Sequence, residues 1–383
     1  MILFYTDNMR IGFLMPSIFM AKKFSKDRIF APGDLARQLV NGLVDCGHEV
    51  FFYTAADVES YGKVIAGDKD LLEKELNYYL FRNRSVEEKT YTTSEIRKRD
   101  YEYALTLRAY KDAKEGKIDI IHSFHDFGAH YFNELTKFPT VYTLHDPMPP
   151  ADSLEYYRLK RFSHHNYISI SDRQRVGMDL HFVATIHHGI DISSFAQGRG
   201  KGKYLLYFGR ILKDKAPHEV IRIGKKLGIP VKIASSQNSA NRDREYYETQ
   251  IKPFIDGRMV SEVGFLEGQE KAKLIGDALA FVFPLQWEEP FGLVLIESMA
   301  CGTPVVAYNR GSVSELVIDG STGYVIDKNN EEGLEAAVEK IRDLSTDDYN
   351  RMRQKCREHV QNHFITEKMV EAHIKVYSQV LAG

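Results

Sequence analysis

The chain of 383 residues contains little cysteine, a single tryptophan and no long apolar run. Its cysteines, Cys46, Cys301 and Cys356, are odd in number and far apart, which argues against a disulfide framework and favours a reducing compartment. The apolar start of the chain is interrupted by Asp7 and Gly12, and no later run approaches the roughly 18 residues that span a bilayer. We expect a cytoplasmic protein, with peripheral membrane contact left open.

An excess of charge of one sign is also missing. The 51 Lys and Arg residues nearly balance the 53 Asp and Glu residues, giving a formal net charge of −2. Nucleic acid is therefore not expected as a partner, because a polyanion-binding protein normally carries surplus positive charge. The length exceeds what one hydrophobic core usually organises, so two domains are expected.

Short apolar runs alternate with amphipathic segments, the pattern of helices that cover a parallel sheet. In the first half a helix is expected over 33–47, and strands are expected at 10–16, 48–55, 119–124, 140–146 and 166–171. After a Gly-rich stretch at 189–202, further strands are expected at 204–210, 231–236, 260–266, 278–284, 303–308 and 323–327. The fold class predicted is α/β, with two Rossmann-like, doubly wound domains facing each other across a cleft.

Residues 58–117 interrupt this pattern, because they are highly charged and rich in Tyr, Lys and Arg. They predict an inserted helical segment in the N-terminal domain, with helices over 69–84 and 93–116. Two interpretations stay open for this segment. It is either a solvated helical layer or a surface that binds an acceptor or a membrane.

The stretch FPLQWEEPFGLVLIESMACGTPVVAY, residues 283–308, places two carboxylates around a helix start. Glu289 comes just before a helix expected to begin near Gly292, and Glu297 lies about 7.5 Å further along it. The free N–H groups of Phe291, Gly292 and Leu293 would face the ligand crevice at the carboxyl end of the preceding strand. The two carboxylates could bind separate hydroxyl groups of one long ligand such as a sugar nucleotide. The alternative is that Glu289 is an ordinary charge at a helix start and Glu297 a surface residue.

Two further positions suggest phosphate binding. Arg210 is the last residue of an expected strand, and Lys215 precedes a helix that Pro217 can start. Two cationic side chains are therefore expected near the free N–H groups of a helix start, an arrangement suited to a diphosphate. Gly33 stands at the first helix start of the other domain, where a residue without Cβ lets phosphate approach the backbone. A solvated basic loop and an ordinary N-terminal turn are the respective alternatives.

Arg210 and Lys215, followed by Glu289 and Glu297 with seven residues between, resemble the signature of the retaining glycosyltransferases of family 4, which have the GT-B fold. The segments HHGIDISSF and MACGTPVVAYNRGSVSELVIDGSTGYVI resemble the linker and the donor-domain core of that family. The resemblance implies an N-terminal acceptor-side domain over 1–187, completed by a C-terminal helix at about 364–383. A donor-binding domain would span 188–363.

The resemblance also implies roles for these residues. Glu297 would bind the ribose of the nucleotide, and Glu289 the hydroxyls of the transferred sugar. Arg210 and Lys215 would neutralise the diphosphate, which Gly33 would approach from the N-terminal domain. Two departures from the family pattern put fine donor preference in doubt: Ala216 follows the lysine in place of glycine, and Pro32 precedes Gly33 in place of a paired glycine.

His145 matches a family position beside the reacting sugar, although a structural histidine is the alternative. His125 and Asp126 are candidates for the acceptor side. The spacing of His122, His125 and His130 is a poor zinc pattern, so no metal is expected.

These observations predict a metal-independent hexosyltransferase of carbohydrate biosynthesis that retains anomeric configuration. Its co-substrate would be a UDP-sugar, with a GDP-sugar next, and its acceptor a glycan, a lipid-linked sugar or a small molecule. A non-catalytic nucleotide-sugar-binding subunit and a nucleotide-sugar epimerase on the same fold are the alternatives.

Overall fold

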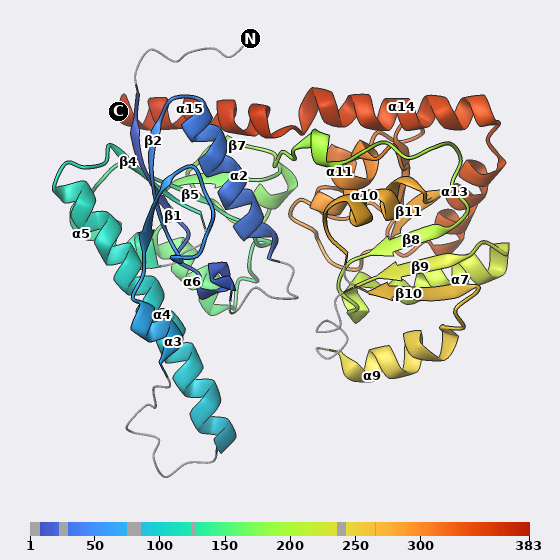
Figure 1. The fold of residues 1–383 in the computed structure, drawn as a ribbon, viewed down its shortest axis with the longest axis horizontal. Coiled ribbons are helices and arrows are strands. Elements are labelled where there is room, and N and C mark those ends of the chain that lie inside the picture. Colours follow the sequence, from blue (N-terminus) through green and yellow to red (C-terminus); the bar gives the residue numbers. More distant parts are fainter. Residues whose placement is uncertain (1–7, 23–29, 75–85, 125–127, 236–242, 265) are drawn as a thin grey trace. The chain divides into compact units, whose positions relative to one another are not determined.

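The structure of the protein is a computed structural model that describes residues 8–22, 30–74, 86–124, 128–235, 243–264 and 266–383 (Figure 1). The chain divides into two compact units. The first contains Met1–Ser169, Gly177–Ile186 and Val370–Gly383, and the second contains Ile170–Val176 and His187–Met369.

Unit 1 is built on a seven-stranded parallel sheet in the order β3-β2-β1-β4-β5-β6-β7. Its strands are β1 (Arg10–Leu14), β2 (Glu49–Thr54), β3 (Lys63–Ala66), β4 (Ile120–Ser123), β5 (Thr140–Thr143), β6 (Asn166–Ser169) and β7 (Phe182–Thr185). Its helices are η1 (Ile18–Met20), α2 (Ala31–Asp45), α3 (Lys69–Glu73), α4 (Val86–Lys114), α5 (Gly128–Thr136), α6 (Leu154–Arg161) and most of α15 (Thr366–Leu381). The doubly wound parallel sheet expected for the first half is therefore present.

Alternating side chains of β4 explain how helices cover both faces of this sheet. Ile121 belongs to the apolar cluster that contains Tyr101 and Leu105 of α4. The next residue, His122, points to the opposite face, where its Nδ1 lies 2.6 Å from the hydroxyl of Tyr377 in α15. The two faces are thus buried under helices from distant parts of the chain, and the C-terminal helix packs on the first sheet (Figure 1).

The inserted segment differs in part from the expectation of two helices. Residues 63–66 form β3, which pairs with β2 at the edge of the sheet, and α3 is only five residues long. The second expected helix is present as α4, which begins earlier, at Val86, and runs for 29 residues. Much of the first expected helix, residues 75–84, lies outside the described residues.

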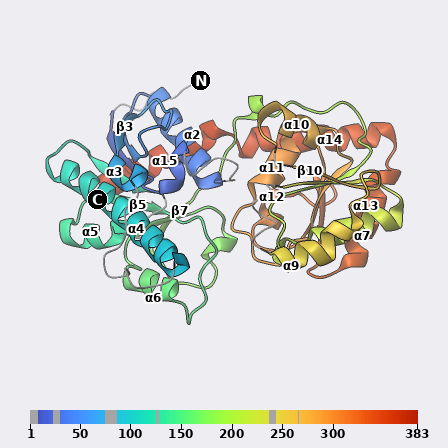
Figure 2. The same cartoon turned by 60° about the horizontal axis from the view of Figure 1, so that its bottom comes forward.

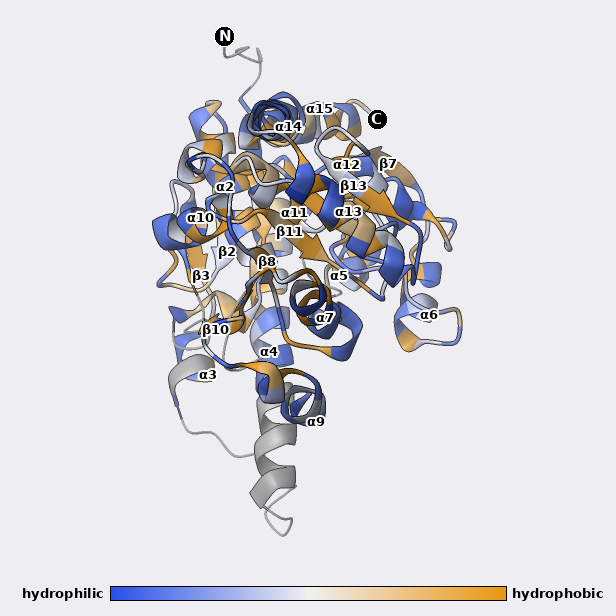
Figure 3. Ribbon diagram, turned by 90° about the vertical axis from the view of Figure 1, so that its right-hand side faces the viewer, coloured by the Kyte–Doolittle hydropathy of each residue, from blue (hydrophilic) through white to orange (hydrophobic). Residues whose placement is uncertain are grey.

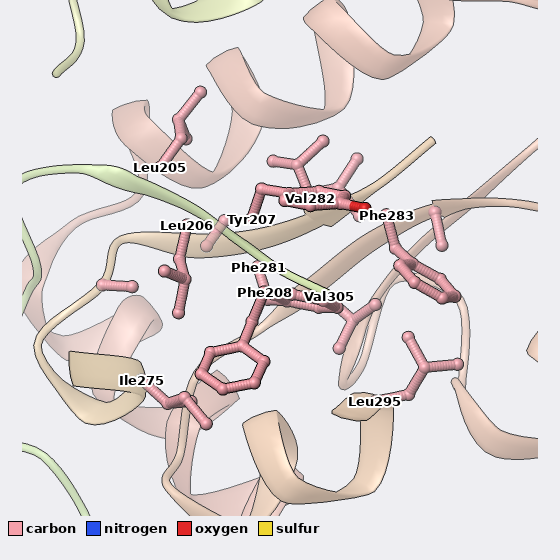
Figure 4. Packing of buried hydrophobic residues seen from close by; sticks show 14 of the residues in the cluster. Leu205, Leu206, Tyr207, Phe208, Ile275, Phe281, Val282, Phe283, Leu295 and Val305 are labelled. Atoms are coloured by element: carbon pink, nitrogen blue, oxygen red, sulfur yellow. The ribbon is translucent and has the colours of Figure 1, made fainter. Parts of the chain in front are cut away.

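Unit 2 contains a six-stranded parallel sheet in the order β10-β9-β8-β11-β12-β13. Its strands are β8 (Leu205–Phe208), β9 (Val231–Ala234), β10 (Val260–Gly264), β11 (Ala280–Phe283), β12 (Val305–Tyr308) and β13 (Gly323–Ile326). All six coincide with runs expected from the sequence. Their central members are buried on both faces, as the packing of Leu206, Phe281 and Val305 shows (Figure 4).

The helices of unit 2 lie on both faces of this sheet (Figure 2). The main ones are α7 (Pro217–Leu227), α9 (Arg244–Tyr246), α10 (Gly268–Gly276), α11 (Leu293–Ala300), α12 (Val313–Leu316), α13 (Glu331–Asp343) and α14 (Thr346–His363). Short turns of helix occur at η3 (Arg173–Arg175), η4 (Ile192–Ser194), η5 (Lys213–Lys215), η6 (Tyr247–Ile251) and η7 (Lys252–Phe254). Apolar residues gather along strands such as β11, whereas α9 carries mostly hydrophilic colour (Figure 3).

The linker motif of unit 2 has a clear steric basis. A Cβ on Gly189 would lie 2.2 Å from the carbonyl oxygen of Ile365, so only glycine allows the two segments to approach. Ile190 then donates to Phe364 O and accepts from Thr366 N, at 2.9 and 3.2 Å. The expected linker is thereby fixed to the segment that leads into α15.

None of the helices among the described residues combines the length and the apolar character needed to cross a lipid bilayer.

Candidate functional site

The strand order of unit 2 defines where a ligand site is expected. The chain runs outward from β8 through β9 to β10, and then returns to β11 on the other side of β8. The loops after β8 and β11 therefore separate at a topological switch point, where open α/β sheets bind ligands. Lys215 follows β8 and Glu289 follows β11, so both candidate residues come from this point of the sheet.

Lys215 and Glu289 form an ion pair across the switch point. Nζ of Lys215 lies 2.6 Å from Oε2 of Glu289, and both side chains are largely buried, with 12% and 15% of their surface exposed. Trp287 donates from Nε1 to the same carboxylate oxygen at 3.1 Å, and its ring lies 4.7 Å from the Lys215 ammonium. The ammonium is therefore held between a carboxylate and an aromatic face, which fixes its position.

The backbone of Arg210 is fixed at the end of β8 by Tyr207. The Tyr207 hydroxyl donates to the backbone carbonyl of Arg210 at 2.6 Å. Complete burial raises the pKa of Tyr207 well above its usual value, so the phenol stays protonated and remains a donor. Arg210 forms no ion pair with a carboxylate of the described residues, which leaves its charge available to an anionic ligand.

The loop between Arg210 and α7 has an unusual conformation at Ala216. This residue has φ 48° and ψ 42°, in the left-handed region that favours glycine. Its N–H group donates to Lys213 O at 3.0 Å, and Pro217 starts α7 immediately afterwards. Ala216, which stands where the family pattern has glycine, thus still allows this turn but adds backbone strain.

The loop that carries Glu289 is held in place by hydrogen bonds to its backbone carbonyl groups. Ser312 N donates to Glu289 O at 3.0 Å, Ser171 Oγ to Pro290 O at 2.6 Å and Ser312 Oγ to Phe291 O at 2.5 Å. Because these three consecutive carbonyls all have donors, the backbone of the loop is fixed over residues 289–291.

The segment that supplies Ser171 is fixed by a carboxylate. Glu315 in α12 accepts from the N–H groups of Asp172 and Arg173 at 2.9 and 2.7 Å. His187 Nε2 lies 3.1 Å from the same carboxylate. Glu315 therefore holds the segment 170–176 against the rest of unit 2.

Gly292 starts α11 as expected. It has φ 85°, in the left-handed region, and it is the N-cap of the helix. The first N–H groups of α11, beginning with Leu293, have no acceptor within the helix and give this end partial positive charge. The side chain of Phe291 is buried against His188, with ring centroids 5.0 Å apart, so only its backbone is suited to contact a ligand.

Glu297 lies on α11 one turn after the helix start, and it also has a lysine partner. Oε1 of Glu297 lies 2.7 Å from Nζ of Lys271 in α10, with 13% and 20% of the side chains exposed. The Lys271 ammonium also lies 5.0 Å from the centre of the Phe208 ring at the end of β8. The alternative of a surface carboxylate is therefore wrong for Glu297.

The remaining expected residues belong to unit 1. Gly33 lies in the first turn of α2, and a Cβ there would come within 2.7 Å of Met20 Sδ and Phe30 Cδ1. The need for glycine is thus explained by packing within the unit, and phosphate contact stays a prediction. His125 and Asp126 lie outside the described residues.

His145 follows β5 and lines a pocket of about 130 Å³. Its ring is half-buried and packs edge-on against Phe124, with centroids 4.3 Å apart. Thr143, Asp146 and Met148 also line this pocket, so it offers both polar and apolar contacts. The role expected for His145 beside a reacting sugar stays a prediction.

Two residues of the unit 2 site were not anticipated. Trp287 is the only tryptophan of the chain and stands two residues before Glu289, which is a usable signal. Lys271 gives no such signal, because α10 contains a second lysine, Lys273, and the sequence does not reveal which lysine faces Glu297.

Comparison with known proteins agrees with this architecture. Residues 190–362 match a family model described as glycosyl transferases group 1, and residues 34–194 match one described as Glycosyltransferase Family 4. Glycogen synthase of Mycobacterium tuberculosis is 33% identical over 176 residues, covering 44% of this chain and 41% of the relative. The chain therefore spans less than half the length of this curated relative.

Solved structures are similar over almost the whole chain. Sucrose-phosphate synthase from Thermosynechococcus elongatus has a TM-score of 0.75 at 20% identity, covering 98% of this chain and 100% of that one. HepE of Anabaena, solved in complex with UDP and glucose, has a TM-score of 0.68 at 16% identity, covering 97% and 100%. With the two adjoining family models, these similarities show that the chain has the GT-B fold of the glycosyltransferases.

Proposed function

We propose that the protein is a glycosyltransferase that moves a sugar from a nucleotide-diphosphate donor to an acceptor hydroxyl with retention of anomeric configuration. The observation that supports this most is the Lys215–Glu289 ion pair at the switch point of unit 2, where Arg210 also follows β8. Cations suited to a diphosphate and a carboxylate suited to sugar hydroxyls meet there, next to a helix start.

In this proposal Arg210 and Lys215 bind the diphosphate. As the bond from the anomeric carbon to the phosphate oxygen breaks, negative charge grows on the leaving phosphate, and the two cations stabilise it. Because two cations of the protein supply this charge, the reaction is proposed to need no metal. The leaving phosphate oxygen accepts the proton of the acceptor hydroxyl, which attacks from the same face.

The lysine partners suggest how the charges of the two carboxylates are balanced before the donor binds. Lys215 neutralises Glu289 in the structure, and Lys271 neutralises Glu297. We propose that the diphosphate draws Lys215 toward itself, so that Glu289 accepts hydrogen bonds from the transferred sugar. Glu297 would accept from the ribose hydroxyls, while the backbone N–H groups of 291–293 contact the rest of the sugar.

UDP is the proposed nucleotide, with GDP next. HepE of Anabaena, which shares the fold, was solved with UDP and glucose, and this favours a UDP-hexose. The donor-binding domain is proposed to be residues 188–363, and the acceptor-side domain residues 1–187 with 364–383.

On the acceptor side we propose Gly33 near the diphosphate and His145 near the reacting sugar. His125 and Asp126 would contact the acceptor, which we propose to be a glycan, a lipid-linked sugar or a small molecule. All three cysteines are free in the structure, which fits a cytoplasmic location.

The test is transfer from labelled UDP-hexoses and GDP-hexoses to a panel of acceptors, with the anomeric configuration of the product read by NMR. Glu289→Ala should abolish transfer and hydrolysis while the protein still binds UDP. Glu248→Ala is the matched control, because Glu248 also pairs with a lysine, Lys252, at 2.8 Å, but both side chains are exposed. Donor binding without transfer or slow hydrolysis in the parent protein would favour a binding subunit, and inverted product would refute retention.

A further inference from the structure

Unit 1 contains a cluster of ligand-type side chains that the proposed transfer does not use. Glu134 in α5 and the consecutive residues His164 and His165, between α6 and β6, place their donor atoms within 4.8 Å of one another. Oε1 of Glu134 lies 2.7 Å from His164 Nε2 and 3.1 Å from His165 Nε2. One oxygen and two imidazole nitrogens thus converge on one point.

We propose that Glu134, His164 and His165 bind a divalent zinc-type cation. Two histidines and one glutamate form a donor set that Zn²⁺ uses in proteins, and water completes the tetrahedron. Zinc–ligand bonds near 2.0–2.1 Å place tetrahedral donors about 3.3 Å apart. The two observed separations, 2.7 and 3.1 Å, therefore need to open by about 0.6 and 0.2 Å to reach that spacing.

His165 is oriented for ligation by its surroundings. Its Nδ1 lies 2.8 Å from Nδ1 of the buried His130, and its ring lies nearly parallel to those of Phe162 and Tyr142, with centroids 5.4 and 5.2 Å away. When Nε2 binds a metal, Nδ1 carries the proton and donates it to His130. This is the arrangement that supports histidine ligands in metal sites.

The accessible side of the cluster leaves room for the remaining ligand. His164 has 59% of its side chain exposed, whereas His165 has 5%. The ammonium of Lys137 contacts Oε2 of Glu134, so the metal would share this carboxylate with a lysine. Lys137 therefore competes with the cation and provides a direct test of the geometry.

The experiment uses the full chain freed of metal with a chelator, and zinc chloride as the probe in equilibrium dialysis. We expect one zinc per chain at micromolar concentration, with at least tenfold weaker binding for His164→Ala and Glu134→Gln. Lys137→Met should bind zinc more tightly than the parent, because the competing ammonium is gone. Cobalt substitution should give the visible bands of a four-coordinate nitrogen and oxygen site in the parent and lose them in His164→Ala.

His363→Ala is the matched control, because His359 and His363 form another histidine pair, with ring centroids 5.0 Å apart in α14 of unit 2. This variant should keep the zinc stoichiometry. The proposal is overturned if the parent binds no zinc, if His164→Ala binds as the parent does, or if His363→Ala loses the metal instead. Melting curves of the metal-free variants, which should match that of the parent, separate loss of ligands from loss of fold.

Discussion

Gly311 packs directly against the backbone of Glu289: a Cβ at Gly311 would lie 2.0 Å from the carbonyl oxygen of Glu289 and 2.5 Å from its nitrogen. The loop after β12 and the loop after β11 are therefore in backbone contact at the candidate site. Neither loop can shift alone without opening the hydrogen bonds of Ser312 to Glu289 and Phe291.

Gly311→Ala should accordingly destabilise unit 2 by about 2–4 kcal/mol and weaken donor binding, because the clash adds to left-handed strain at φ 56°. Gly320→Ala is the control, since Gly320 has φ 70° but open space around its Cβ position. Gly320→Ala should lower the free energy of unfolding by only about 1–2 kcal/mol, because only the backbone conformation opposes the substitution. Urea unfolding of both variants measures the difference, and equal losses would contradict the steric argument.

Lys215→Met should destabilise the protein by about 3 kcal/mol, because it leaves the Glu289 carboxylate largely buried without its cation. Lys215→Met combined with Glu289→Gln should recover part of that stability but no transfer activity. The control pair is Lys252 and Glu248, whose exposed ion pair should couple by at most about 0.5 kcal/mol. A double-mutant cycle on each pair gives the two coupling energies, and similar values would argue against a special role for the switch-point pair.

Lys271→Met and Glu297→Ala should weaken nucleotide binding more than they slow turnover at saturating donor. The reason is that Glu297 in α11, with its partner Lys271 in α10, is proposed to bind the ribose and not the reacting sugar. Titration with UDP and with GDP, alongside kcat and KM, provides the measurement. A loss confined to kcat would contradict the assignment of Glu297 to the ribose.

Ala216→Gly should stabilise the protein by about 0.5–1 kcal/mol, since glycine adopts φ 48° without the strain that alanine carries. Ala372→Gly, inside α15, should instead lower stability by about 1 kcal/mol. Chemical denaturation of the two variants tests this. An Ala216→Gly variant that unfolds more easily than the parent would show that the left-handed turn is not strained.

Glu315 predicts a pH dependence of stability. Burial alone raises the pKa of Glu315, but the hydrogen bond with His187 and the N–H groups of Asp172 and Arg173 outweigh it and leave the pKa below 4.5. Because the folded pKa is lower than the unfolded one, this stabilisation is present above about pH 4.5 and is lost as the pH falls through the folded value.

Glu315→Gln should therefore cost about 1–2 kcal/mol at pH 7 and progressively less toward pH 3. Urea midpoints of the parent and the variant across this range provide the measurement. A constant difference at all pH values would contradict the proposed linkage.

The sequence predicts the two sheets well because central strands are short, apolar and rich in β-branched or aromatic residues. It misses β3, whose residues are exposed or half-buried at an edge and lie in a charged region. It also misses β7, the other edge strand of the same sheet, whose four residues are all half-buried. Edge strands give a weak signal because only part of each side chain is buried.

Residues of the site can be predicted from the sequence where a charged side chain directly follows a recognisable strand. Arg210, Lys215 and Glu289 could be found because each follows a recognisable strand. The contact between Lys271 and Glu297 could not be found, because it joins two helices whose relative rotation is set by packing on the sheet. The same holds for Glu134 and His165, which are brought together only by the folding of unit 1.

The position of Trp287 gives the molecule a built-in optical probe. The chain has no other tryptophan, and this indole donates to Glu289 while its face lies against the Lys215 ammonium. Any ligand that draws the ammonium away changes the electric field at the indole, and the emission of the whole protein reports that change. Intrinsic fluorescence can therefore follow occupancy of this single site without an introduced label.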